Sequence, residues 1–428
     1  MEVLLQYLWK HKIFPLKPLQ TDSGLSIEVI DPGLWNTNSG PDFFNAKLKI
    51  QGTVWVGNIE IHEHSSDWFR HGHDKNKAYD SVILHVIGQS DCSVYRTTGE
   101  PIPQFVLICP PELKDHYEQL CHIRSYPACQ SVVARLSPFF IHSWLSALEA
   151  ERLDHKMKDI ERWLRYCNQN WEDTFFITLA RNFGFGLNGE AFECWAKKIP
   201  FRAVDKHRDD LFQIEAFFFG QAGLLNDTNG DPYFTDLQKE FFYLQHKFEL
   251  VSPMEKNVWR FLRLRPSNFP FIRLAQLAYL YHHGEGLFSK LMEAEDLNEI
   301  RNLLTIRTSS YWEEHYVFGK YSRREAKKLG DRTIDLICIN TIIPFLHAFG
   351  QHKGEERLSD RAQHFLEQLR AENNVITRKW NKVGIKVDSA ADSQALIELE
   401  REYCEKKRCL DCRFGFEFMH GKVITHRP

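Results

Sequence analysis

Residues 46–62 limit the possible folds of this chain more than any other segment, because their side chains alternate with a period of two. Apolar residues at 46, 48 and 50 are separated by lysines, which is typical of a strand with one buried and one solvated face. Gln51-Gly52 is a turn signal, and a second strand-like run extends from Val54 to His62. The pattern therefore predicts a β-hairpin.

The residues around this hairpin predict the other elements of a mixed domain. Helical spacing covers 2–13, and a helical turn is indicated at 68–71. Further strands are predicted from Gly24 onwards, at 81–87, and as a second hairpin formed by 93–95 and 104–109. This order predicts an α/β or α+β domain over about residues 1–125.

The pattern becomes helical after Pro110-Pro111. Helical spacing recurs at 112–120, 137–168, 173–183, 211–225, 236–250, 273–283, 288–294, 323–349 and 361–372. Glycines and prolines punctuate these segments. We therefore expect a mostly α-helical domain over 126–400, followed by a short cysteine-containing element at 401–428.

Composition narrows the classes of partner. Of the 428 residues, 43% are apolar and 26% are charged, which is typical of a globular protein, and the net charge of −3 gives no basic field over the whole molecule. Any nucleic-acid contact therefore has to come from a local patch. The N-terminus lacks the features of a signal peptide, and no run of 18 uncharged apolar residues predicts a membrane span. We expect a cytoplasmic location and no membrane partner.

The second strand of the first hairpin carries the residues best suited to chemistry. Glu60 and His62 are predicted to lie on one exposed strand face, about 7 Å apart, while Ile59 and Ile61 face the core. Asp42 precedes the first strand, and hairpin pairing brings it near Glu60. An Asp and a Glu suit Mg²⁺ or Mn²⁺, and His62 can orient or deprotonate a water molecule. We therefore predict Asp42, Glu60 and His62 as catalytic residues.

The order of helix, strand, Pro41-Asp42, hairpin, Glu60-Ile61-His62, helical turn and strand resembles the core of the PD-(D/E)XK nuclease superfamily. In that superfamily the Asp and the Glu hold Mg²⁺, and a Lys two residues after the Glu positions the attacking water. The resemblance implies a restriction-endonuclease-like core in which Asp42 and Glu60 hold the metal. His62 stands at the lysine position and can act as a base near neutral pH.

Several neighbouring residues are candidates for a supporting shell. The resemblance implies an acidic residue on the first helix or strand, which here is Glu2 or Glu28. The supporting shell that we predict from the surrounding sequence also includes Asn58, His64, His71 and His73. His71 and His73, separated by one glycine, can also be ordinary loop residues. If the histidines bind the metal directly, the protein is instead a His/carboxylate metalloenzyme that acts on a small molecule. His85, in an apolar strand, is interpreted as a core histidine.

Motifs in the same region are also similar to those of an uncharacterised bacterial family, known as a domain of unknown function. The strings are Asn-x-x-Ser-Gly-Pro-Asp-Phe, Gly-Asn-Ile-Glu-Ile-His, Asp-Trp-x-x-His-Gly-His and Val-Ile-Leu-His-Val. This resemblance covers nearly the whole chain, and it implies no activity of its own.

Three cysteines near the C-terminus form a second candidate metal site. Cys404, Cys409 and Cys412 have the spacing C-x4-C-x2-C, which in a reducing compartment indicates Zn²⁺ or a [4Fe–4S] cluster. The fourth ligand is expected to be Cys129 or Cys121. The arrangement is loosely similar to the cysteines of some nucleases in helicase–nuclease complexes. The alternative is that these are unpaired thiols.

Arginines in the helical region are the candidate nucleic-acid contacts. Arg263, Arg265 and Arg273 lie among aromatic residues, which suits phosphate and base contacts of DNA or RNA. A helix that ends at Pro266 explains the same arginines without a partner. Together these patterns predict a metal-dependent nuclease-like protein that hydrolyses phosphodiester bonds, or, alternatively, a non-catalytic nucleic-acid- or protein-binding module with a degenerate nuclease fold.

Overall fold

The computed structural model describes residues 1–15, 17–123, 127–227 and 230–421. The chain forms two units, of which the first combines residues 1–136 with the segment from Glu402 onwards and the second is Ser137–Arg401. The sequence placed the cysteine element apart from both domains. The structure groups it with the first unit, because helix α20 (Arg413–His420) packs against α3 (Pro111–His122) and α4 (Gln130–Val133).

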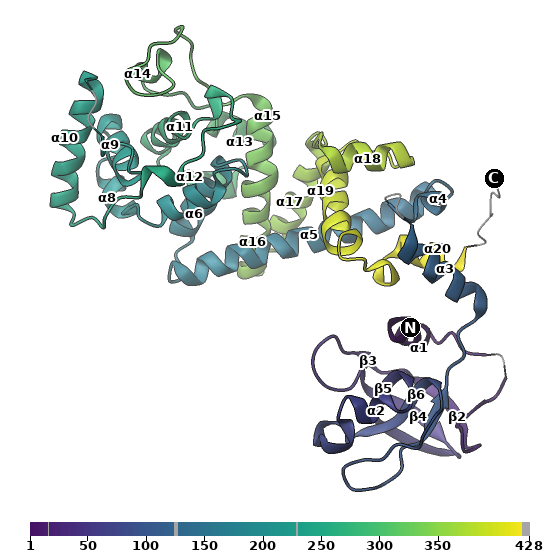
Figure 1. Cartoon of the computed structure of the whole chain (residues 1–428). Helices are drawn as coiled ribbons and strands as arrows, with labels where there is room; N and C mark the ends of the chain where they lie inside the picture. The colour runs from purple at the N-terminus through teal and green to yellow at the C-terminus, as the bar shows by residue number, and fades with distance from the viewer. Residues whose placement is uncertain (16, 124–126, 228–229, 422–428) are drawn as a thin grey trace. The chain divides into compact units, whose positions relative to one another are not determined.

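The first unit is built on a seven-stranded mixed sheet that follows helix α1 (Glu2–Lys10) (Figure 1). The strands are β1 (Leu19–Gln20), β2 (Ser26–Asp31), β3 (Leu34–Trp35), β4 (Phe43–Ile50), β5 (Thr53–His64), β6 (Val82–Gln89) and β7 (Gln104–Val106). Their order is β1-β2-β4-β5-β6-β7, with β3 also paired to β4. Pairing is antiparallel from β1 to β5 and parallel from β5 to β7.

The sheet curls until its two edges meet. Asp22, just beyond β1, donates its backbone N–H to the carbonyl of Gln104 in β7 over 2.9 Å. The second predicted hairpin is only partly present. Tyr95 and Pro101 form an isolated antiparallel bridge around the expected turn, but β7 pairs with β6 instead. The parallel pairing of β7 with β6 could not be predicted from the local periodicity of the sequence, because it joins segments that are distant in the chain.

The first predicted hairpin is confirmed. Strands β4 and β5 pair directly across Gln51 and Gly52, which have φ angles of 49° and 82°. Positive φ at both central residues is the geometry of the two-residue turns that match strand twist, and glycine adopts it without strain. This turn sets the register of β5 as far as Gly57, beyond which the register shifts.

The exposure of β5 differs from the prediction. Glu60 and His62 are only 5% and 1% exposed, so they do not lie on a solvated face. The reason is that β5 is a central strand and that both α1 and α2 (Asp67–Arg70) pack against it. Both faces of the strand are covered, and residues 59–62 are all buried.

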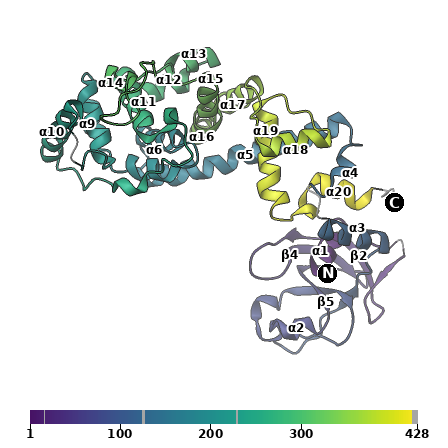
Figure 2. The ribbon, with the colours of Figure 1, turned by 45° about the horizontal axis from the view of Figure 1, so that its top comes forward.

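The second unit is mostly helical, as predicted, and its longest helix is α5 (Pro138–Tyr166), beside which α6, α16 and α19 pack (Figure 2). Pro138 opens α5, and the Ser137 side chain caps it by accepting the N–H of Phe140. The other helices are α6 (Trp171–Phe183), α7 (Gly189–Ala196), α8 (Phe201–Lys206), α9 (Leu211–Gln221), α10 (Pro232–Lys247), α11 (Pro270–His283), α12 (Leu287–Glu293), α13 (Leu297–Leu303), α14 (Ser310–Glu313), α15 (Asp331–Ile337), α16 (Ile343–Lys353), α17 (Glu356–Gln368), α18 (Val375–Val383) and α19 (Ala390–Glu398).

A π-helical turn, Cys338–Ile342, joins α15 to α16, so that one helical stretch runs from Asp331 to Lys353. It begins later than the predicted helix at 323, after an extended Gly330. By length and composition this stretch is apolar enough to cross a membrane, which the sequence did not predict. Because 72% of its most apolar window is buried within the structure, core packing accounts for its composition.

Candidate metal centre

The hairpin brings Asp42 and Glu60 together. Phe43 pairs with Ile59 in the β4–β5 register, which places the two acidic residues side by side. The backbone N–H of Asp42 donates to Glu60 Oε2 over 3.1 Å, and the N–H of Ile61 donates to Asp42 Oδ2 over 2.9 Å. Each carboxylate therefore accepts a backbone hydrogen bond at or next to the other acidic residue. The two residues are close together, as the hairpin predicts.

A β-bulge shapes this part of the hairpin. The register shifts between Phe43 and Ala46, and Asn45 has a φ of 55°. Asn58 stabilises the bulge, because its Oδ1 accepts the N–H of Asn45 and its amide donates to Ser81 Oγ. Bulges re-aim neighbouring side chains. Asn58 thus supports the hairpin through Asn45 and Ser81.

Helix α1 contributes to the carboxylate pair. Gln6 donates its amide to Asp42 Oδ1 over 2.9 Å. One turn earlier on α1, the negative charge of Glu2 contributes to raising the pKa of Asp42 and of Glu60. Glu28, by contrast, is exposed and lies 3.8 Å from Lys49. Of the two acidic candidates for completing the site, the geometry favours Glu2.

Burial makes ionisation of this pair unfavourable. Burial is the main cause that raises the pKa of Asp42, and the neighbouring Glu60 raises it further. Burial likewise raises the pKa of Glu60, with Glu2 as a further cause. Like charges in a poorly solvated site disfavour each other. A bound cation is the simplest way to ionise both groups together, because it compensates the negative charge.

Three imidazoles lie next to the carboxylates. One ring nitrogen from each of His62, His71 and His73 can be chosen so that all three lie within 4.8 Å of one another. Glu60 Oε1 is 3.2 Å from His73 Nε2 and 3.5 Å from His62 Nε2. Gly72 lies between His71 and His73 and has a φ of 72°, a conformation that glycine adopts readily and that turns the chain between the two histidines. Together these atoms form a mixed oxygen and nitrogen donor set.

His73 is held as a ligand would be. It is 7% exposed, and its ring stacks on that of Tyr79 at a centroid distance of 3.7 Å. Its Nε2 is buried without a hydrogen bond, although Glu60 Oε1 is close by. Because Glu60 Oε1 is its nearest polar neighbour at 3.2 Å, this nitrogen and the carboxylate could both reach one cation.

A chain of side chains fixes the protonation of His62. The Gln104 amide N–H groups donate to Asp22 Oδ2 and to the carbonyl of Cys92. Gln104 Oε1 is therefore left to accept from His85 Nδ1, 3.2 Å away. His85 Nε2 must then accept from His62 Nδ1, 2.8 Å away.

This relay leaves His62 Nε2 with its lone pair directed at Glu60 and at His71 Nδ1, which is 3.1 Å away. Burial lowers the pKa of His62 far below its usual value, and that of His85 to about 4, so both rings are neutral. A neutral imidazole with a fixed outer hydrogen bond is the usual form of a metal-ligating histidine. The interpretation of His85 as a core histidine is confirmed, because it is 0% exposed and both ring nitrogens have partners, but the sequence did not single out Gln104.

The remaining predicted site residues lie elsewhere. His64 orders the start of α2, where its N–H donates to Asp67 Oδ2. Arg263 and Arg265 are exposed in the second unit. Arg273 is 5% exposed and donates to Gln276 and Asn268, which leaves it no surface for a phosphate. No helix ends at Pro266, because the residues before it are irregular and α11 begins at Pro270.

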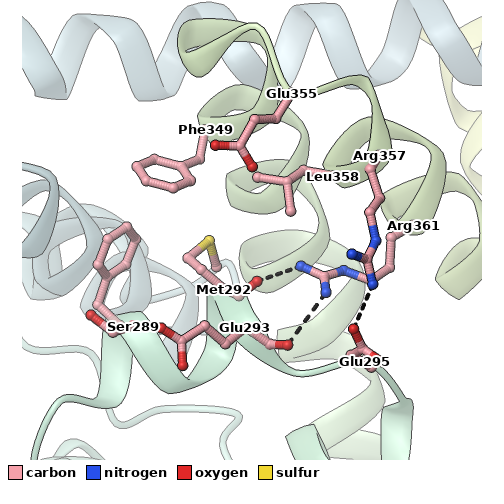
Figure 3. Close-up of a pocket in the computed structure, with 10 residues that line it drawn as sticks. Ser289, Met292, Glu293, Glu295, Phe349, Glu355, Arg357, Leu358 and Arg361 are labelled. Carbon is pink, nitrogen blue, oxygen red and sulfur yellow. Dashed lines mark hydrogen bonds and ion pairs between the residues drawn. The ribbon is translucent and has the colours of Figure 1, made fainter.

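A pocket of about 350 Å³ in the second unit is a weaker candidate (Figure 3). It lies beside α12, α16 and α17. Arg361 donates to the carbonyls of Met292 and Glu293, and Arg357 pairs with Glu295 over 2.6 Å. These arginines are engaged by the protein itself, so the pocket offers less chemistry than the centre around Glu60.

The chain belongs to the family described as "Protein of unknown function (DUF2851)", whose model matches residues 2–375. This confirms the resemblance to an uncharacterised family, and it establishes no link to the nuclease superfamily. No curated protein and no solved structure matches the chain. The carboxylates, the imidazoles and Gln104 all fall within the matched range, whereas the three C-terminal cysteines lie beyond it.

Mn²⁺ binding is expected to strengthen as pH rises. Because the folded, metal-free protein holds protons on Asp42 and Glu60 above their ordinary pKa values, it loses stability as pH rises through those raised values, and the metal competes with the same protons. Isothermal titration calorimetry should show affinity at least about tenfold tighter at about pH 8 than at about pH 6, with proton release.

The Glu60→Gln variant separates this effect from histidine titration, because it removes one acidic proton and keeps all the imidazoles. Its pH dependence should be flatter and its affinity weaker than those of the wild type. An affinity that is independent of pH, or that increases on acidification, would contradict the carboxylate assignment.

Gln104→Met is expected to weaken Mn²⁺ binding by roughly 10- to 100-fold, because His85 loses the acceptor that sets its tautomer. Gln89→Met, at the exposed end of β6, is the matched control and should bind as the wild type does. The ¹⁵N shifts of the His62 and His85 ring nitrogens report the tautomers directly. Unchanged shifts and affinity in Gln104→Met would refute the relay.

Proposed function

We propose that the first unit is a divalent-metal-dependent phosphodiesterase of nuclease-like architecture that acts on DNA or RNA. The observation that carries the proposal is the convergence of the half-buried Asp42 and the buried Glu60, both with raised pKa values, beside three imidazoles. Neighbouring carboxyl groups in a poorly solvated site do not both ionise easily, and a divalent cation compensates their negative charge.

The order of elements supports a nuclease-like core. Helix α1 is followed by the antiparallel strands β2, β4 and β5, by α2, and by β6 parallel to β5. Asp42 precedes the hairpin, and Glu60 lies on its second strand. These are the positions that the PD-(D/E)XK resemblance implies, and Glu2 on α1 is placed to supply the additional acidic residue.

The donor set suggests which residues hold the metal. Glu60 Oε1 lies 3.2 Å from His73 Nε2 and 3.5 Å from His62 Nε2, and these three atoms are the proposed ligands, with Asp42 and His71 beside them. Carboxylate oxygens alone suit Mg²⁺, whereas added imidazoles favour a transition metal. We therefore favour Mn²⁺ over Mg²⁺ among the two predicted ions. The metal, when bound, lowers the pKa of a coordinated water molecule.

His62 acts in this proposal as a ligand and not as the general base. Its Nδ1 is committed to His85, and its lowered pKa makes it a poor proton acceptor near neutral pH. The lysine position of the related nucleases is thus taken by a residue with a different role. This is the main departure from the function that the resemblance implies.

The solvent side of the centre suits an anionic substrate. His71 is exposed, and the connection that carries it also exposes Arg70, Lys75 and Lys77. Exposed cations near His71 attract a phosphodiester. Arg263 and Arg265, exposed in the second unit, are further candidates for phosphate contact. Arg273 is no longer proposed, because it is buried.

A second candidate function is a His/carboxylate metalloenzyme that acts on a small molecule. The observation that favours it is the number of imidazoles, since three in one cluster exceed what the nuclease resemblance implies. The two functions differ in substrate. A nuclease should cleave polynucleotides with Mn²⁺, whereas the alternative enzyme should leave them intact.

The test is Mn²⁺-dependent cleavage of single- and double-stranded DNA and RNA by the full chain. Glu60→Gln and His73→Gln should each lower the rate by on the order of 100-fold or more, because each loses a metal ligand. Glu28→Gln, an exposed acidic residue of the same sheet, is the control and should cleave at the wild-type rate.

Equal cleavage by wild type and Glu60→Gln would assign the activity to a contaminant. Tight Mn²⁺ binding without cleavage of any polynucleotide would reject the nuclease function. It would leave the small-molecule enzyme or the non-catalytic module, which a panel of simple phosphoesters distinguishes.

A further inference from the structure

The cysteines of the first unit come together from distant parts of the chain. Cys129 immediately precedes α4, and Cys412 immediately precedes α20, which packs against α4. Cys409 begins the 3₁₀ turn Cys409–Asp411, against which α20 also packs. Cys404 ends the preceding π-helical turn, Leu399–Cys404. The fold thus brings the start of α4 to the three clustered cysteines.

The backbone around these cysteines is tightly folded. The N–H of Cys412 donates to the carbonyl of Cys409 over 3.3 Å, and that of Lys407 donates to the carbonyl of Cys404 over 3.1 Å. Gly415 of α20 sits directly on Cys409, since a Cβ at this glycine would lie 1.8 Å from the Cys409 carbonyl oxygen. Only glycine permits this close packing, which fixes the positions of Cys409 and Cys412.

Two of the four cysteines are buried, and Cys404 and Cys409 are half-buried. Cys129 and Cys412 are 8% and 6% exposed. Burial raises the pKa of Cys129 and of Cys404, and the charges of Cys412 and Cys409 raise both further. Cys121, the other candidate for the fourth ligand, is exposed, and its charge adds to the effect of burial in raising the pKa of Cys409. The geometry therefore favours Cys129 over Cys121.

The spread of the thiols distinguishes between metals. One tetrahedral Zn²⁺ with bonds of about 2.3 Å requires sulfur atoms only about 3.8 Å apart. Among the described residues, the group with three ligand atoms all within 4.8 Å is the imidazole cluster, so no three of these thiols are that close. In an iron–sulfur cluster the thiolates bind different iron atoms and stand further apart.

We propose that Cys129, Cys404, Cys409 and Cys412 bind an iron–sulfur cluster, each thiol losing its proton on ligation. This inference does not depend on the proposed function, because the centre is separate from Glu60 and its imidazoles. The cluster connects segments that are 275 positions apart (129 to 404). It would hold the segment after Glu402 against α4, where the chain returns to the first unit.

The test is the metal content of the full chain, expressed with ample iron and purified anaerobically. Iron and acid-labile sulfide should be present in equal amounts, with a broad visible absorption that bleaches on reduction. Zinc without iron, or no metal at all, would overturn the proposal. This measurement on the wild type decides it even where a variant fails to fold.

Variants then identify the ligands. Cys129→Ser and Cys412→Ser should lose the iron and sulfide, whereas Cys121→Ser, at the exposed edge, and Cys109→Ser, elsewhere in the first unit, should retain them. Retention in Cys129→Ser together with loss in Cys121→Ser would overturn the ligand set. Mn²⁺-dependent activity is not needed for either readout, so failure of the nuclease function leaves this test intact.

Discussion

The reciprocal hydrogen bonds between Asp42 and Glu60 are the constraint on which the candidate site depends. Each carboxylate accepts an N–H from the strand that carries the other, so both are fixed to the β4–β5 hairpin. The hairpin lies under α1 and α2, and the burial that follows raises both pKa values. Backbone donors alone do not compensate two buried negative charges. The neighbouring imidazoles, with His73 Nε2 3.2 Å from Glu60 Oε1, complete a set of donors suited to a cation.

Local sequence signals were sufficient for the hairpin and for the closeness of its acidic residues. A two-residue turn with glycine sets the register near the turn, whereas the register shift between Phe43 and Ala46, which the sequence did not predict, sets Asp42 opposite Glu60. The alternation of Glu60 and His62 with isoleucines nevertheless led to a wrong expectation of exposure. Alternation distinguishes the two faces of a strand, but it does not reveal that α2 covers the second face.

The contacts that sequence reasoning missed depend on long-range pairing. His85 faces Gln104 only because β6 and β7 run parallel, and the intervening chain has the local signals of a hairpin. The choice of Glu2 over Glu28 depends on how α1 packs on the sheet. The sequence predicted Arg273 to be an exposed cation that contacts nucleic acid. In the structure it is buried on α11, where it stabilises the fold. A signal for Gln104 was present: a polar residue that begins an apolar strand beside a buried histidine.

The central claim is that Glu60, His62 and His73 share one metal ion. Anomalous diffraction from crystals of the full chain soaked in Mn²⁺ tests it most directly. The account predicts one strong peak about 2.0–2.3 Å from Glu60 Oε1, His62 Nε2 and His73 Nε2. A peak bound elsewhere, or none at these atoms under conditions in which calorimetry detects binding, would contradict it.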